Sequence, residues 1–445
     1  MKQVIFMGFP RFVSRLMLIL LPMHVAMAEL RIEVTEGLDD AVKVAVVPFV
    51  WEGREALPEN LAEIVDADLR LSGRFETTPV DQMLSLPTSA SEVFPRDWQL
   101  LQVEYVVIGR IQAISDRFQL RFELYNVPRQ SIDIVQTIEG NIDELRDMAH
   151  YVSDVVFENL TGIEGAFSTR IMYVTATGPL DDRTFRLNIA DADGHRIETV
   201  LESKEPVLSA TWAPDGNRIA YQSFEKDSRP AIYIADLTTG LRQQVTDYAG
   251  LNGAPAFSPD GKSLAMVLSK DGSPDIYVLD IASRRLRRIT RHYGIDTEPS
   301  WTPDGEAIIF TSSRGGKPQI YQMTLRDLSI ERLTFEGDYN AKASFLPDGS
   351  GLIMVHRRDG IYHIAMFDLK RGRMSILTET SLDESPSIAP NGSMLIYATQ
   401  VNDNGILAAV SVDSRVKFNL PSSEGDVREP AWSPKKRRTF TPLSP

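Results

Sequence analysis

Short apolar runs separated by polar turns recur at a regular interval over residues 170–434. The turns read Pro-Asp-Gly or a close variant of it, as in "FSPDGKSLAMV" at residues 257–267. Their prolines are 45, 44, 44, 43 and 44 residues apart: Pro214, Pro259, Pro303, Pro347, Pro390 and Pro434. A period of this length, filled with short strands, is typical of the blades of a β-propeller.

The strand that follows each turn is apolar on both faces. After Pro259 come Leu264, Ala265 and Met266, and the same three positions are apolar after each of the first five turn prolines. Continuous apolar residues indicate a strand covered on both sides, as in a blade that is stacked between two neighbours. In the turn, proline fixes φ at the second position and glycine accepts the left-handed conformation, so each copy predicts one tight hairpin.

The first and last units of the repeat are incomplete in complementary ways. Residues 170–201 contain three strand-like runs with no proline turn before them, whereas "REPAWSP" at 428–434 supplies an inner strand with nothing after it. Together they make one blade, which leaves no open sheet edge at the seam. The sequence therefore predicts a six-bladed β-propeller closed by pairing of the C-terminal strand into the first blade.

Residues 29–165 predict a separate α/β domain. A strand-like run at 42–50 precedes a helical pattern at 60–73, and three antiparallel strands are expected at 105–114, 118–127 and 132–140. A second helix follows Asn141, which forms a capping box with Glu144, and it ends at Gly162. We place a linker at 162–168, the propeller at 166–434 and a basic tail at 435–445, which contains "KKRR". That tail is expected to be solvated; contact with an acidic rim or an anionic surface is the alternative.

The first 28 residues have the pattern of a secretory signal peptide. A basic start precedes an apolar stretch, and "AMA" at 26–28 offers small residues before the expected cleavage after Ala28. An uncleaved anchor is the alternative. No later apolar run is long enough to span a membrane. The chain has no cysteine, which excludes disulfides, thiol catalysis and a lipid anchor on an N-terminal cysteine.

Charge and motifs exclude several classes of function. The chain carries 47 basic and 61 acidic residues, for a net charge of -14, which argues against nucleic-acid binding. Neither H-E-x-x-H nor G-x-S-x-G occurs, and the six histidines show no ligand-like spacing. We therefore expect no metal, no cofactor and no serine-hydrolase nucleophile.

Polar residues gather just before each predicted inner strand. In a propeller these loops emerge on one face near the ring axis, so they predict an acidic, hydrogen-bonding rim around the channel mouth. Ordinary solvated loops are the alternative. The rim residues are Asn252, Asp296, Glu298, Asp338, Asn340, Asp383, Glu384, Asp426 and Glu429.

With these features in place, the sequence resembles the TolB family, periplasmic components of the Tol–Pal system of Gram-negative bacteria. The resemblance spans the chain to about residue 434. It rests on "VVPF" (46–49), "IVDADLRLSGRF" (64–75), "VFENLTGIEGAFSTRI" (156–171), "NGAPAFSPDGKSLA" (252–265), "TEPSWTPDG" (297–305) and "LDESPSIAPNG" (382–392). The tail after Pro434 departs from the family, which usually ends there.

The resemblance implies a monomeric periplasmic coupling protein, not an enzyme, that serves outer-membrane integrity and constriction during cell division. In the family, the channel mouth binds the peptidoglycan-associated lipoprotein Pal, which points here to Asn252, Gly253, Thr297, Glu298, Asp383 and Glu384. The mature N-terminus binds the inner-membrane protein TolA, which points to residues 29–40, above all Glu29, Leu30, Arg31, Ile32, Glu33 and Val34.

The N-terminal segment alternates apolar and polar residues, so it could add as a strand to a partner's sheet. An edge strand of the small domain is the alternative, and both states could exchange. An exported hydrolase or lyase that uses the channel, and a sensor of a small ligand, are the competing functions. The former needs converging acid–base or metal groups, which the sequence does not assemble.

Overall fold

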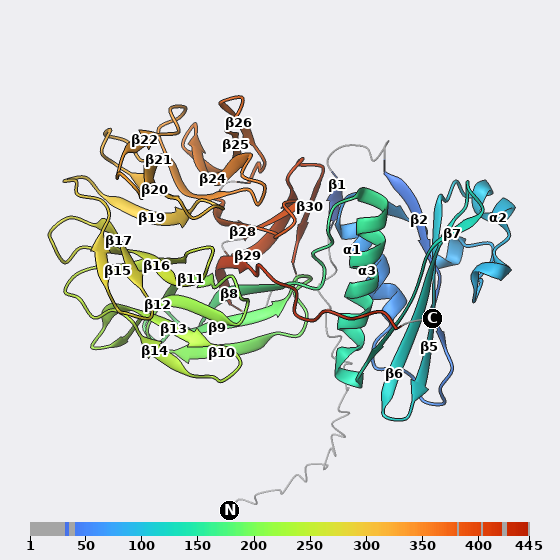
Figure 1. Ribbon diagram of the computed structural model, residues 1–445. Helices are drawn as coiled ribbons and strands as arrows, with labels where there is room; N and C mark the ends of the chain where they lie inside the picture. The colour runs from blue at the N-terminus through green and yellow to red at the C-terminus, as the bar shows by residue number, and fades with distance from the viewer. Residues whose placement is uncertain (1–31, 35–40, 381, 402–403, 421–424, 444–445) are drawn as a thin grey trace, which may run out of the picture.

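The computed structural model describes residues 32–34, 41–380, 382–401, 404–420 and 425–443. It consists of an α/β domain beside a β-propeller (Figure 1). The predicted signal peptide, residues 1–28, lies outside the described residues. Within the described part of the chain, no helix has the length and apolar character needed to cross a membrane.

The α/β domain is built on a mixed sheet of order β4-β2-β5-β6-β7, with β3 pairing with β5. The long helices α1 and α3 cover one face, where they share a core with β2, β5, β6 and β7. On the other face, Trp98 of the short helix α2 packs against Val106 and Ile108 of β5. The strands are β2 Val42–Val46, β3 Val50–Trp51, β4 Phe75–Thr77, β5 Tyr105–Ile114, β6 Arg117–Asn126 and β7 Ser131–Gly140; the helices are α1 Leu61–Leu71, η1 Val80–Gln82, η2 Ala90–Glu92, α2 Pro95–Leu100, η3 Ile142–Glu144 and α3 Leu145–Thr161.

The helix boundaries are set by local capping. The expected capping box of Asn141 and Glu144 is present and opens the turn η3, which leads into α3. Gly162 ends α3 with φ of 72°, a left-handed conformation that glycine adopts without strain. Because α3 contributes Leu145, Met148 and Val152 to the core, these caps fix where its apolar face meets the sheet.

Six sheets form the propeller, as the proline spacing predicts; five have four strands and one has five. Each Pro-Asp-Gly turn links the inner strand of a blade to its second strand, and its glycine is left-handed, with φ of 67° at Gly261. Blades two to five are β11 Val207–Trp212 to β14 Arg242–Gln244, β15 Asn252–Phe257 to β18 Leu286–Arg288, β19 Asp296–Trp301 to β22 Ile330–Arg332, and β23 Asn340–Phe345 to β26 Arg373–Ile376. Their middle strands are β12 Arg218–Lys226, β13 Arg229–Asp236, β16 Ser263–Leu268, β17 Asp275–Asp280, β20 Ala307–Ser312, β21 Gln319–Thr324, β24 Gly351–Arg358 and β25 Ile361–Asp368.

The ring closes through the predicted composite blade. The C-terminal strand β31 Asp426–Trp432 pairs antiparallel with β8 Arg170–Thr177, so that Trp432 lies opposite Ile171. Strands β9 Thr184–Asp191 and β10 Glu198–Ser203 complete this blade. Indole groups tie neighbouring blades together: Trp212 donates to the Ala431 carbonyl and Trp301 to the Ala256 carbonyl, each at 3.0 Å.

Blade six carries a fifth strand. Its own strands are β27 Glu384–Ile388, β28 Met394–Val401, β29 Asn404–Ser411 and β30 Val416–Asn419, and β1 Ile32–Val34 pairs antiparallel with β30. Residues 32–34 of the N-terminal segment are therefore a docked strand, but on the propeller. The expectation that they form an edge strand of the small domain is wrong. Without β1, the outer edge of β30 would present unpaired backbone groups beside the α/β domain. Pairing with β1 satisfies these groups.

The basic tail lies along the junction between the domains, where Lys436 and Arg437 are half-buried while Lys435 and Arg438 remain exposed. Residues 435–443 run from the end of β31 across the junction onto the α/β domain, where the C-terminus lies in Figure 1. Lys436 pairs with Asp154, and the Leu443 amide donates to the Thr137 carbonyl at 2.8 Å. The expectation of a solvated tail is therefore wrong for Lys436 and Arg437, which meet acidic side chains of α3 and blade one and not the acidic rim.

Candidate functional site

The channel mouth lies on the propeller face that points away from the α/β domain. Asn391, in the hairpin turn at the end of the inner strand β27, donates to the Glu164 carbonyl at 2.9 Å in the interdomain linker. The hairpin turns therefore face the α/β domain. Since each inner strand begins at the opposite end, the loops that precede these strands form a free rim.

Four predicted rim residues are wholly buried: Asn252, Asp296, Asn340 and Asp383. Asp296 accepts from Ser312 at 2.6 Å and from Arg314 at 2.7 Å. The Asn252 amide donates to the Tyr248 carbonyl at 2.7 Å. The expectation that these side chains line an exposed rim is corrected, because each one satisfies polar groups of its own loop or blade.

Asn340 and Asp383 play the same role in blades five and six. Asn340 donates to Gln319 at 2.8 Å and is hydrogen-bonded to His356, while Asp383 accepts from the hydroxyls of Thr378 and Thr380. Asp338, by contrast, is half-exposed. A hydrogen bond from Arg357 holds the pKa of the Asp338 carboxyl below its usual range, so it stays ionised at the rim.

Each inner strand contains a β-bulge built on one left-handed residue that is not glycine. The bulge interrupts the register with the second strand, for example between Thr297 and Ser300. Left-handed backbone is costly for such residues and clusters at functional sites. The six bulge residues, with φ from 47° to 55°, are Ser209, Ala254, Glu298, Lys342, Ser385 and Glu429.

Bulge residues connect neighbouring blades around the channel. The Glu298 carboxylate accepts from Thr311 and from the Lys342 amide, each at 2.8 Å. Lys342 donates to Ser385 at 2.7 Å, and Glu429 accepts from the Ser209 amide. The bulges therefore hold two carboxylates and one ammonium group at the mouth in fixed positions.

A polar hollow opens beside these bulge residues. Its volume is about 730 Å³ including the part that is open to solvent, and it is bounded by Glu298, Lys342, Glu384, Ser385 and Glu429, with the rings of Tyr339 and Tyr362. Glu384 is exposed and Thr297 is half-buried at this mouth. Gly253 is buried, and a Cβ there would lie 2.5 Å from the Gln222 side-chain oxygen, so a larger residue would require that side chain to move. Asp426 is tied down by Arg428 at 2.6 Å.

Apolar side chains on the same loops form an exposed crescent that the sequence analysis did not identify. Tyr293 is 89% exposed and Phe335 is 71% exposed. Leu251 and Ile295 directly precede Asn252 and Asp296, the first residues of their inner strands. That position in the repeat could have identified them as exposed loop residues from the sequence. The crescent consists of Tyr248, Leu251, Tyr293, Ile295 and Phe335.

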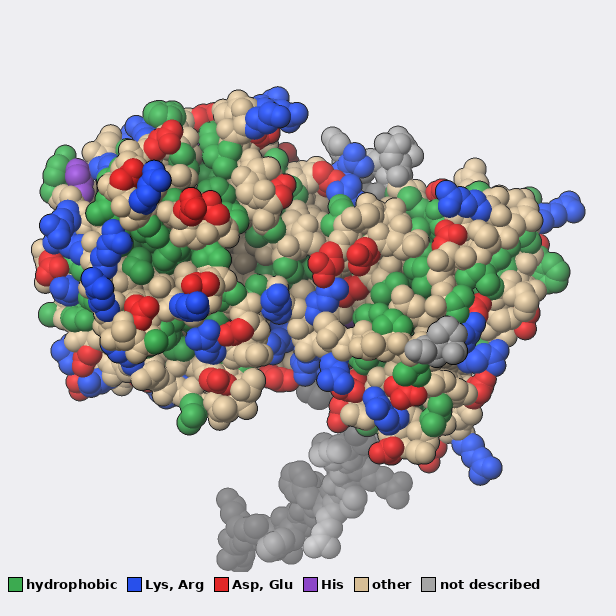
Figure 2. Space-filling view, viewed as in Figure 1, with side chains coloured by type: hydrophobic (Ala, Val, Ile, Leu, Met, Phe, Trp, Pro, Cys, Tyr) green, Lys and Arg blue, Asp and Glu red, His purple; other side chains and the backbone are tan. Residues whose placement is uncertain are grey.

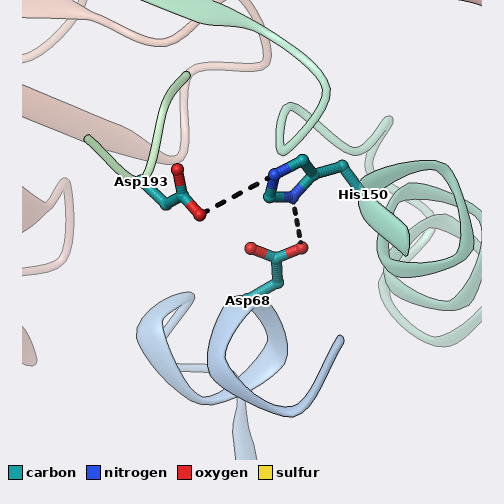
Figure 3. Close-up of side chains that lie close together, drawn as sticks. All are labelled: Asp68, His150 and Asp193. Carbon is teal, nitrogen blue, oxygen red and sulfur yellow. Dashed lines mark hydrogen bonds and ion pairs between the residues drawn. The ribbon is translucent and has the colours of Figure 1, made fainter. Parts of the chain in front are cut away.

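A second polar cluster lies where the domains meet. His150 on α3 is 2% exposed, its Nδ1 lies 2.8 Å from Asp68 Oδ2 on α1, and its Nε2 lies 3.7 Å from Asp193 Oδ2 of the propeller (Figure 3). Burial opposes the charged imidazole, yet the carboxylates of Asp68 and Asp193 outweigh it and raise the pKa of His150 to about 9. The cluster is an ionic bridge between the domains.

The three side chains have a composition that could bind a metal ion, but their surroundings supply the positive charge. Arg146 is bonded to the same Asp193 oxygen that faces His150. Arg196 binds Asp147 at 2.7 Å and Asp191 at 2.6 Å. Arg146, Arg196, Arg437 and the imidazolium are four cations that face the carboxylates of Asp68, Asp147, Asp191 and Asp193. A divalent ion would add uncompensated positive charge.

Comparison with known proteins defines the family. The model described as "TolB amino-terminal domain" matches residues 30–132, and that described as "TolB beta propeller domain" matches residues 157–436. The chain belongs to the TolB family.

Its relatives match over nearly the full chain. The Tol-Pal system protein TolB of Alcanivorax borkumensis is 60% identical over 410 residues, which cover 92% of this chain and 94% of that one. The corresponding protein of Pseudomonas syringae pv. tomato is 57% identical over 413 residues, 92% and 95% of the two chains. The crystal structure of TolB from Acinetobacter baumannii has 44% identity and a TM-score of 0.84, covering 92% of this chain and all of its own. TolB-family membership makes this chain a component of a Tol–Pal system.

Proposed function

We propose that this TolB-family chain is a periplasmic protein-binding hub, with no enzymatic activity, that couples TolA to the lipoprotein Pal. In this role it serves outer-membrane integrity and constriction during division. The channel mouth receives Pal, and the N-terminal segment, residues 29–34, receives TolA. Membership of the Tol–Pal system supports a role in the cell envelope. The proposal rests mainly on an observation at the channel mouth.

That observation is the combination of fixed carboxylates with exposed apolar groups on one face. Glu298, Glu384 and Glu429 border the hollow, and Tyr293 and Phe335 are exposed on loops that precede inner strands. Protein interfaces draw most of their affinity from a few aromatic anchors, while charged groups fix partner choice. A donor-rich protein surface with apolar pockets therefore fits this face.

Capture of Pal by charge-reversed chains tests the assignment. Glu298→Lys is expected to weaken binding by about a hundredfold or more, since a like-charge or unpaired contact at an interface costs several kcal/mol. Glu384→Lys tests the same face at an exposed residue whose side chain forms no hydrogen bond or ion pair with the described residues. Glu306→Lys, in the hairpin turn on the opposite face of the same blade, is the control. Full binding by both rim variants would refute the assignment.

Blade six connects the two proposed binding regions. Its sheet runs β1-β30-β29-β28-β27, so the N-terminal strand lies at one edge and Asp383 and Glu384 lie where the other edge begins. Strand addition to a partner requires β1 to leave β30, because the same backbone groups serve both. We propose that occupancy by Pal and by TolA is linked through docking and release of β1.

Deletion of residues 29–40 tests this linkage. Removing β1 exposes the edge of β30 and is expected to change Pal affinity several-fold, measured by calorimetry on the mature chain. A chain with Ile32 and Val34 changed to serine keeps its length and serves as a milder form of the same change. Identical Pal affinity in all three chains would show that the two regions are independent.

A further inference from the structure

The described part of the basic tail, residues 435–443, is here called the strap. It begins where the closing strand β31 ends, and the Arg437 amide donates to the Ser168 carbonyl at 2.6 Å. The Phe440 ring then packs edge-on against Tyr151 of α3, with centroids 5.6 Å apart. At its far end the Leu443 amide donates to Thr137 on β7. The strap therefore starts on the propeller and ends on the sheet of the α/β domain.

Two strap cations face carboxylates that are buried in the junction. Lys436 Nζ lies 3.3 Å from Asp154 Oδ2, and Asp154 also accepts from the Phe167 amide of the linker at 2.8 Å. Burial raises the pKa of Asp154, and Lys436 opposes that shift. Arg437 lies 3.6 Å from Asp191 and 3.9 Å from Asp147. Figure 2 shows basic and acidic side chains intermixed where the domains meet.

The same junction positions the edge on which β1 docks. A Cβ on Gly73, at the end of α1, would lie 2.3 Å from Val416, the first residue of β30. Arg74 pairs with Asp413 just before β30, at 3.4 Å. The strap contacts α3 through Asp147 and Asp154, and the start of β30 contacts the end of α1. Since Asp68 and His150 join α1 to α3, both contacts act on the same pair of helices.

We propose that the strap fixes the two domains in the arrangement in which β1 docks on β30, so that release of the strap frees the N-terminal segment. The strap is then a regulatory element built into the fold. This inference concerns the docking of β1 alone and does not depend on the partners proposed above. The bistable element is β1, which is paired or unpaired, and the strap biases that equilibrium.

Hydrogen–deuterium exchange of the full mature chain, followed by mass spectrometry, tests the proposal. In Lys436→Ala/Arg437→Ala, amides of β1 and β30 are expected to exchange at least tenfold faster, while those of β15–β18 keep their protection. Lys435→Ala is the matched control: Lys435 is exposed and, within the described residues, forms no ion pair. Unchanged exchange at β1 in the double variant would overturn the proposal.

A milder variant keeps the test decisive if the double variant does not fold. Arg438 is half-exposed, pairs with Glu144 at 3.2 Å and lies over the Phe440 ring, so Arg438→Ala loosens the strap without removing a buried charge. A two- to threefold acceleration at β1 and β30, absent from β15–β18, supports the inference. Equal exchange in Arg438→Ala and the unaltered chain contradicts it.

Discussion

The buried imidazole of His150 makes a quantitative prediction about stability and pH. The ring is enclosed by Asp68 of α1 and Asp193 of the propeller, and it is reachable by solvent over only 2% of its surface. Burial alone would lower its pKa, but the carboxylates raise the pKa to about 9 from the unfolded value of 6.5. The folded protein therefore binds a proton more tightly than the unfolded chain does.

The direction of the pH effect follows from that difference. Below pH 6.5 both states hold the proton and the stabilisation is complete; between 6.5 and about 9 only the folded state holds it, so stability falls as pH rises. The contribution of His150 is about 3 kcal/mol at pH 6 and about 1 kcal/mol at pH 8. It vanishes above pH 9.

Urea unfolding of the unaltered chain and of His150→Gln, at pH 6, 7, 8 and 9, measures this contribution. Glutamine keeps a polar group in the site but cannot carry the proton. The difference in unfolding free energy between the two chains is expected to shrink by about 2 kcal/mol or more from pH 6 to pH 9. Comparison of the two chains cancels titrating groups outside this cluster, such as His356, whose pKa is lowered by burial. A difference that stays constant over this range would refute the reasoning.

Three further changes test the packing. Gly73→Ala forces a side chain into a left-handed position with φ of 70° and against Val416, and is expected to lower the unfolding free energy by about 2 kcal/mol or more, seen as a fall in melting temperature. Trp301→Phe removes the indole bond to the Ala256 carbonyl and is expected to cost about 1 kcal/mol in urea unfolding. Arg196→Ala removes a partner of the buried carboxylates of Asp147 and Asp191, so the unfolding free energy is expected to fall by about 3–5 kcal/mol in urea unfolding. Arg186→Ala removes an exposed ion pair with Glu202 and is expected to lower it by about 0–1 kcal/mol.

The repeat made the propeller predictable from the sequence. Turn spacing, apolar triplets and the complementary end units depend on residues close together in the chain, and each reports local geometry. The pairing of β31 with β8 was predictable because the first unit of the repeat has three strands and the last unit has one, which together make a four-stranded blade. The caps of α3 were equally local, since Asn141 and Glu144 are three residues apart.

The rim was less predictable because polarity does not reveal the direction of a side chain. Asn252 and Asp296 look like surface residues in the sequence, yet they turn inward, Asn252 onto the Tyr248 carbonyl of its own loop and Asp296 onto Ser312 of the paired strand. Glu298 and Glu429 reach the mouth because a bulge reverses the alternation at their positions. Period-two reasoning assumes a regular strand, so it misplaces the residues at such a bulge.

The strap was not foreseeable from composition. Its four consecutive basic residues resemble a solvated run, and the acidic groups they meet, Asp154, Asp191 and Glu144, lie hundreds of residues earlier in the chain. Only the position of α3 beside the closing blade brings the two charge sets together. Long-range pairing of this kind depends on how the domains dock, which local patterns do not encode.

Ring closure and domain docking are connected because β31 leads directly into the strap. A chain in which β31 detaches from β8 also loses Lys436 from Asp154 and Arg437 from Asp191, so opening the propeller releases the α/β domain. Separate domains often unfold independently. Here scanning calorimetry is expected to show one transition for the mature chain, and two for a chain that ends at Pro434, because truncation keeps the closing strand but leaves both carboxylates without a strap cation. Two resolved transitions in the mature chain, or one in the truncated chain, would mean that the strap does not couple the domains.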